Sequence, residues 1–136
     1  MYAKRAGKSK INIVGVSSEG LGMKLTKMDV AARQLDTAIR LLFEEVDEVS
    51  VHTLVGAAAN ILCDLRTDRG EEKSWHDHAR EANSMDKKAF LLVLREAQNF
   101  FKHARNDPDE TFEFDPRDTE ELLFIAVLEF GELAAL

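Results

Sequence analysis

Apolar residues recur at helical spacing along most of the chain, and this pattern predicts an all-α protein. The first predicted helix begins at Thr26, whose hydroxyl can cap the free amides of the first turn, while Asp29 completes a capping box. An apolar stripe follows this cap along one helix face. We expect the whole stripe to be buried: Met28, Ala31, Ala32, Leu35, Ala38, Ile39, Leu42, Phe43 and Val46.

A second helix is predicted to begin at Ser50 as its cap and to end at Gly70, a residue that favours helix termination. Its apolar positions are Val51, Leu54, Val55, Ala58, Ile61, Leu62 and Leu65. The run of small residues at 56–59 allows a neighbouring helix to approach closely. This helix is therefore expected at the centre of the protein.

The polar stretch that follows is predicted to form either a short helix over 75–83 or an ordered loop. Another long helix is expected from Ser84 to about Arg105, ended by the Asp107–Pro108 pair, because a residue before proline avoids the helical conformation. The sequence AFLLVL at 89–94 is apolar on all sides, which indicates contact on more than one face. A homodimer interface would explain this surplus.

The last predicted helix has the strongest start signal, with Asp115 as the cap and Pro116 at the first helical position. Before it, TFEF at 111–114 is expected to be extended with both phenylalanines facing the core. The sequence thus predicts an all-α, four-to-five-helix up-down bundle. Its organisation is a flexible basic N-terminal arm at 1–22 and a helical bundle domain at 23–136.

Composition narrows the classes of function. The chain has 136 residues and a formal net charge of −7, which disfavours binding to phosphate backbones and to anionic lipids. Nucleic acid remains possible only through the basic arm or through an RNase role. The single cysteine, Cys63, cannot form an internal disulfide, so we expect a cytoplasmic protein. No segment has the roughly 20 apolar residues of a membrane span.

Candidate chemistry gathers at one predicted end of the bundle. Short connections favour an antiparallel order, which would place His52 beside His103, and imidazoles titrate near neutral pH. The candidate ligand-binding residues are His52, His103, Asn99, Lys102 and Asp107. A structural role stays open, because the helix dipole stabilises a neutral ring at His52 and a charged one at His103. No metal site is predicted, since His76 and His78 point to different sides of a helix, and no cofactor is assigned.

The segments QLDTAIRLLF, VSVHTLVGAA and NFFKHAR followed by DPD resemble a group of short, all-helical bacterial proteins. The resemblance covers roughly residues 23–136. It implies the helical fold and the pairing of the His52 and His103 segments. It implies no activity.

The expected four-helix architecture and QNFFKH at 98–103 resemble the fold and a motif of the higher-eukaryote-and-prokaryote nucleotide-binding (HEPN) superfamily, and this resemblance implies a HEPN-like bundle. RNA-cleaving members carry an arginine, a polar residue and then a histidine on such a helix. Here Asn99 and His103 match the last two, whereas Gln98 stands where the arginine belongs and Arg95 lies too far away. A scissile phosphate would therefore lose its charge-assisted donor, which puts RNA cleavage in doubt.

Three functions follow in order of preference. The first is a non-enzymatic binding module that acts as a homodimer, with a further protein as a possible partner. The second is a HEPN-type ribonuclease or toxin-related protein that uses His103. The third is a small-molecule or metal-binding protein that uses the His52 and His103 end of the bundle.

Overall fold

The computed structural model describes residue 20, residues 22–70, residue 81 and residues 87–135, with the backbone alone over 87–94. In these ranges the chain forms α1 (Lys27–Phe43), α2 (Glu48–Asp68), α4 (Lys87–Lys102) and α5 (Pro116–Ala134), and it contains no strand. The all-α prediction is confirmed for this part. The short helix predicted at 75–83, the AFLLVL side chains and nearly all of the arm at 1–22 lie outside the described residues. No described helix is long and apolar enough to cross a bilayer.

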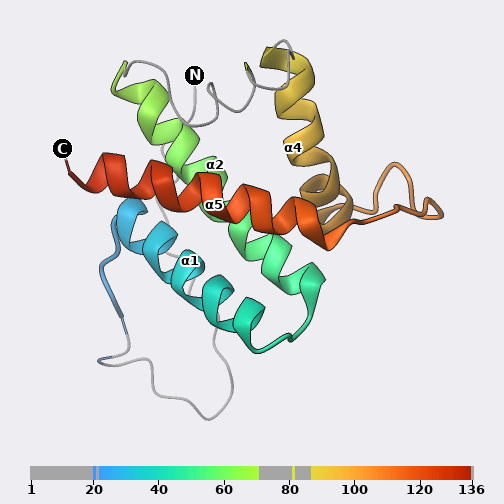
Figure 1. The fold of residues 1–136 in the computed structure, drawn as a ribbon, viewed down its shortest axis with the longest axis horizontal. Helices are drawn as coiled ribbons and strands as arrows, with labels where there is room; N and C mark the ends of the chain where they lie inside the picture. Colours follow the sequence, from blue (N-terminus) through green and yellow to red (C-terminus); the bar gives the residue numbers. More distant parts are fainter. Residues whose placement is uncertain (1–19, 21, 71–80, 82–86, 136) are drawn as a thin grey trace.

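Helix α2 lies at the centre, as its run of small residues predicted. It packs against α1, α5 and α4, and α5 crosses over it in Figure 1. The core is built from the inward faces of α1, α2 and α5. Its buried members are Ala31, Leu35, Ala38, Val51, Val55, Ala58, Ala59, Leu62, Leu122, Leu123, Ala126 and Leu133.

Side-chain contacts give the directions of the helices. Paired residues on α2 and α5 are separated by 63 to 67 positions along the whole contact, so these two helices run in the same direction. His52, early in α2, meets Phe101, late in α4, whereas Asn60, further along α2, bonds Gln98, earlier in α4. These helices therefore run in opposite directions. The starts of α2 and α5 and the end of α4 share one end of the protein, as expected.

The helix caps agree with the sequence at two of three sites. The capping box of Thr26 and Asp29 and the Asp115 cap before Pro116 are confirmed. The Ser50 cap is wrong, because Asp47 caps α2 and its carboxylate accepts the Ser50 backbone N–H at 3.2 Å. A carboxylate is also favoured by the positive end of the helix dipole, which explains the earlier start.

Helix α4 ends at Lys102, earlier than the predicted Arg105. The pair Asp107–Pro108 therefore does not end the helix, which has already stopped several residues before it. After α4, Phe112 and Phe114 are half-buried in a segment without regular structure and make ring contacts with the bundle. The inward orientation predicted for both phenylalanines is confirmed.

The turn between α1 and α2 reverses the chain in a Schellman arrangement. The N–H of Val46 donates to the carbonyl of Leu41 at 3.1 Å, and the N–H of Glu45 donates to that of Leu42 at 3.2 Å. Glu45 takes the left-handed conformation, with φ of 51°. The predicted buried stripe stops before this turn. Phe43, the last residue of α1, is 83% exposed, and Val46, in the turn, is 48% exposed, so their predicted burial is wrong.

We predict that Glu45→Gly stabilises the protein by about 1 kcal/mol. A side chain in the left-handed region costs roughly 1–2 kcal/mol, and the greater freedom of glycine in the unfolded chain offsets part of the gain. Urea unfolding measures the change. Glu45→Ala is the matched control, since it removes the carboxylate and keeps the strain; an equal gain in that variant would contradict the explanation.

Candidate functional site

His52 is the most enclosed titratable group at the predicted functional end. Its Nδ1 lies 2.8 Å from the hydroxyl oxygen of Thr119 on α5, and both residues are buried. The imidazole also makes edge-to-face contacts with Phe101, at 5.7 Å between ring centroids, and with Phe114, at 5.1 Å. Its Nε2 is buried and has no hydrogen-bond partner among the described residues. The ring thus joins α2 to α4, to α5 and to the segment between them.

Four phenylalanines continue this packing around His52. Phe100 stacks on Phe112 at 5.3 Å, and Phe101 meets Phe114 edge-to-face at 5.1 Å. Such aromatic pairs stabilise a fold by more than the burial of their apolar area alone provides. The cluster attaches the segment between α4 and α5 to the ends of both helices.

The surroundings of His52 favour its neutral form. Burial lowers the pKa of the imidazole below its usual 6.5, and the negative charge of Asp118 offsets part of that effect. A proton would put a charge on a ring enclosed by two phenylalanines. His52 at neutral pH is therefore an uncharged hydrogen-bonding group of the core.

The other predicted site residues lie in different surroundings. His103, Asn99 and Lys102 are exposed, and Asp107 is half-buried. The N–H of His103 donates to the carbonyl of Asn99 at 3.1 Å, which continues the helical hydrogen bonding just past the end of α4. The structure brings the end of α4 to the start of α2 through Phe101, but it buries one imidazole and exposes the other. Ligand binding by these five residues stays a prediction.

Gln98, which occupies the place of the HEPN arginine, is a packing residue. It is 2% exposed, and its side-chain oxygen accepts a hydrogen bond from the amide of Asn60 at 2.9 Å. Gly56 of α2 lies so close that a Cβ at that position would be 2.8 Å from the Gln98 side chain. A larger residue at position 56 would therefore displace the Gln98 side chain, and position 98 faces the interior.

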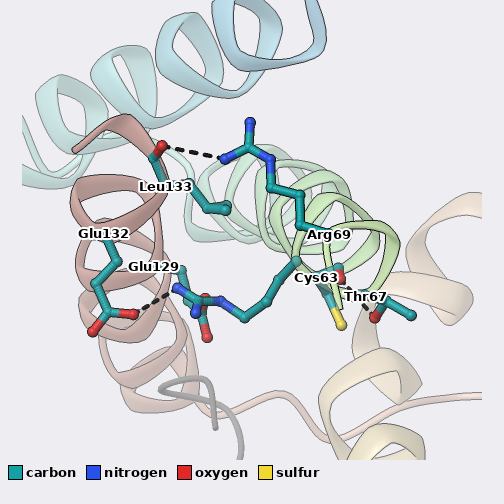
Figure 2. A network of polar contacts seen from close by, with 7 residues as sticks. Cys63, Thr67, Arg69, Glu129, Glu132 and Leu133 are labelled. Atoms are coloured by element: carbon teal, nitrogen blue, oxygen red, sulfur yellow. Dashed lines mark hydrogen bonds and ion pairs between the residues drawn. The ribbon is translucent and has the colours of Figure 1, made fainter. Parts of the chain in front are cut away.

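A second polar network lies further along α2 and α5 (Figure 2). The Nε of Arg66 donates to the fully buried carboxylate of Glu129 at 2.8 Å, and its Nη2 donates to Glu132 at 2.6 Å. Arg69 donates to the backbone carbonyl of Leu133 at 3.4 Å, and the Thr67 hydroxyl donates to that of Cys63 at 2.9 Å. An arginine can bond two carboxylates because its guanidinium carries several fixed donors.

Sequence reasoning missed this network, although a signal for it was present. Glu129 lies between apolar residues on the inward face of α5, and Arg66 directly follows the apolar stripe of α2. Opposite charges at matching places on two neighbouring helices indicate a pair. Thr119 carried no comparable signal, since a threonine in the first turn of a helix is ordinary.

The described residues contain no group of His, Cys, Asp and Glu side chains that could hold a metal ion. Comparisons with protein-family models, curated proteins and solved structures find no match to this chain.

We predict that the free energy of unfolding decreases as the pH is lowered below about 6.5, and that His52 causes this decrease. The lowered pKa means that the unfolded chain binds a proton there more readily than the folded protein. The stabilising contribution of the neutral His52 ring is complete above pH 6.5, and it is lost as the pH is lowered below this value. Urea unfolding between pH 7.5 and 5.5 measures it, and His52→Gln should flatten the slope. A similar flattening by the control His103→Gln would contradict the assignment.

We predict that Glu129→Ala destabilises the protein by about 3 to 5 kcal/mol, since it leaves a buried arginine without its main partner. Glu132→Ala removes a carboxylate that is half exposed and bonds the same arginine, so it should cost about 1 kcal/mol or less. Chemical unfolding of both variants gives the comparison. Equal losses of stability in the two variants would show that the contribution of Glu129 to stability does not depend on its burial.

Proposed function

We propose that the protein is a non-enzymatic helical binding module that acts as a homodimer. The observation that carries the proposal is the outward face of α5 beyond its second turn. Phe124 is 66% exposed and Val127 is 41% exposed on this face. Large apolar side chains at helical spacing on a surface indicate a site that another molecule covers.

The charge along α5 changes at the same point. The exposed residues of its first turns are mainly charged: Arg117, Asp118, Glu120 and Glu121. From Phe124 to Ala135, Glu132 is the one charged residue that is exposed, and Arg66 binds its carboxylate. In a protein of net charge −7, this nearly uncharged face is a place where a second copy can approach without strong repulsion.

The shape of this face also suits a two-fold symmetric pair. Gly131 lies on the same side of α5 as Phe124, and a Cβ at Gly131 would meet nothing within 4 Å. In an antiparallel pair of α5 helices, each Phe124 could occupy the space above the Gly131 of the other copy. A two-fold interface requires this kind of self-complementary surface.

The arrangement of the QNFFKH segment supports a non-enzymatic protein over a HEPN-type nuclease. Asn99 and His103 are exposed, whereas Gln98 is buried and bonds Asn60. Position 98 therefore does not present a side chain to the surface that the other two share. The enclosure of His52 by Thr119 and the phenylalanines likewise favours a structural role over ligand binding.

We predict that the protein has twice the monomer mass in light scattering at micromolar concentration. Phe124→Glu should convert it to a monomer that still unfolds cooperatively, because the substitution places like charges on both sides of the interface and leaves the core unchanged. Phe43→Glu, at an exposed phenylalanine elsewhere, is the matched control and should leave the dimer intact. A monomeric wild-type protein would contradict the proposal.

A further inference from the structure

A second apolar surface lies at the corner between α1 and α2. Phe43 is 83% exposed, Val46 is 48% exposed and Val49 is 42% exposed. We call these three residues the corner patch. They come from the last residue of α1, the turn and the first turn of α2, so a rigid and well-hydrogen-bonded reversal of the chain holds them. Of these three side chains Phe43 has the largest apolar area to bury on binding, and most of it is accessible.

Four carboxylates lie between the residues of the corner patch along the chain. Glu44, Glu45, Asp47 and Glu48 are all exposed, and none takes part in an ion pair with a described residue. The chain has no lysine or arginine between Arg40 and Arg66, and Arg40 is paired with Asp36. The hydrogen bond from the Ser50 side chain lowers the pKa of Asp47, so that carboxyl group stays ionised. The exposed apolar residues thus have negatively charged neighbours that this part of the chain does not neutralise.

We propose that the corner patch docks a basic amphipathic helix of a partner protein. Apolar side chains of that helix would cover Phe43, Val46 and Val49, while its lysines or arginines would face the four carboxylates. An amphipathic helix binds in this way when its apolar face covers an exposed apolar surface, and charge complementarity then sets partner choice and speeds association. The proposal names the partner class of the binding module proposed above and uses a surface separate from α5.

The negative charge of these carboxylates disfavours other classes of binding partner for the corner patch. Nucleic acid and anionic membranes carry the same sign as the carboxylates and are repelled. A second copy placed corner to corner would bring two sets of four carboxylates together. A basic protein segment satisfies both the apolar and the charged parts of the surface.

The test uses the full chain and a synthetic basic amphipathic peptide, LKKLLKLLKKLLKL. Its binding is followed by amide NMR shifts and by calorimetry. We expect the largest shifts at residues 43–50 and an affinity that falls with added salt. Phe43→Ser should weaken binding about tenfold or more, since the burial of a phenylalanine is lost. The control Met23→Ser, at an exposed apolar residue that precedes α1, should leave the affinity unchanged, and the acidic peptide LEELLELLEELLEL should not bind.

Charge is tested separately at Glu45. Glu45→Ala removes one carboxylate and keeps the conformational strain, so it should weaken binding without raising stability. Shifts spread over the whole protein, or equal affinity in Phe43→Ser, would overturn the proposal, because binding would then be general attraction to an acidic protein. Conversion of a dimer to a monomer by Phe43→Ser would also overturn it and would identify a second copy as the occupant. If the monomeric Phe124→Glu variant still binds the peptide, the corner patch binds its partner without dimerisation, and the inference holds whether or not the protein is a dimer.

Discussion

The position of α5 on α2 depends on placing the buried carboxylate of Glu129 beside a cation. An uncompensated charge in the core costs several kcal/mol, so a displacement of α5 that separates Glu129 from Arg66 is strongly disfavoured. Apolar packing supplies the attraction between the two helices, but leucine and alanine contacts tolerate more than one alignment. The Arg66 guanidinium selects one alignment, because it bonds Glu129 in the interior and Glu132 at the edge at the same time.

The rest of the arrangement follows from that alignment. With Glu129 opposite Arg66, Thr119 comes opposite His52 at nearly the same sequence separation, and the buried hydroxyl and imidazole become partners. The two polar contacts fix α5 at both ends of α2. They differ in chemistry, since the ion pair depends on charge whereas the His52 contact requires a neutral ring. The opposite face of α5 is directed outward by the same alignment, and this face carries Phe124.

The sequence predicted the helices and most of their ends, because periodicity and capping are local properties. Thr26, Asp115 and Gly70 act as expected for that reason. It misplaced Phe43 and Val46, since an apolar residue at helical spacing is buried only where another element covers it, and spacing alone does not show where the chain reverses. The turn was hard to predict because Glu45 occupies a left-handed position that usually carries glycine.

For the candidate site, the predicted antiparallel order of the helices correctly placed the start of α2 beside the end of α4. The burial of His52 and the exposure of His103 depended on side-chain packing that no pattern reports.

The two exposed apolar surfaces differ in the charges around them, and this difference is the basis for assigning them different partners. Beyond Phe124 the face of α5 is nearly uncharged, so an identical molecule can meet it without repulsion between like charges. The corner patch lies among four carboxylates, and an identical surface would be repelled there while a basic one is attracted. Hydrophobic burial would supply affinity at either surface, but it does not distinguish one apolar partner from another. Selectivity must then come from electrostatics, which is why the proposed self-association and the proposed basic partner are assigned to different surfaces.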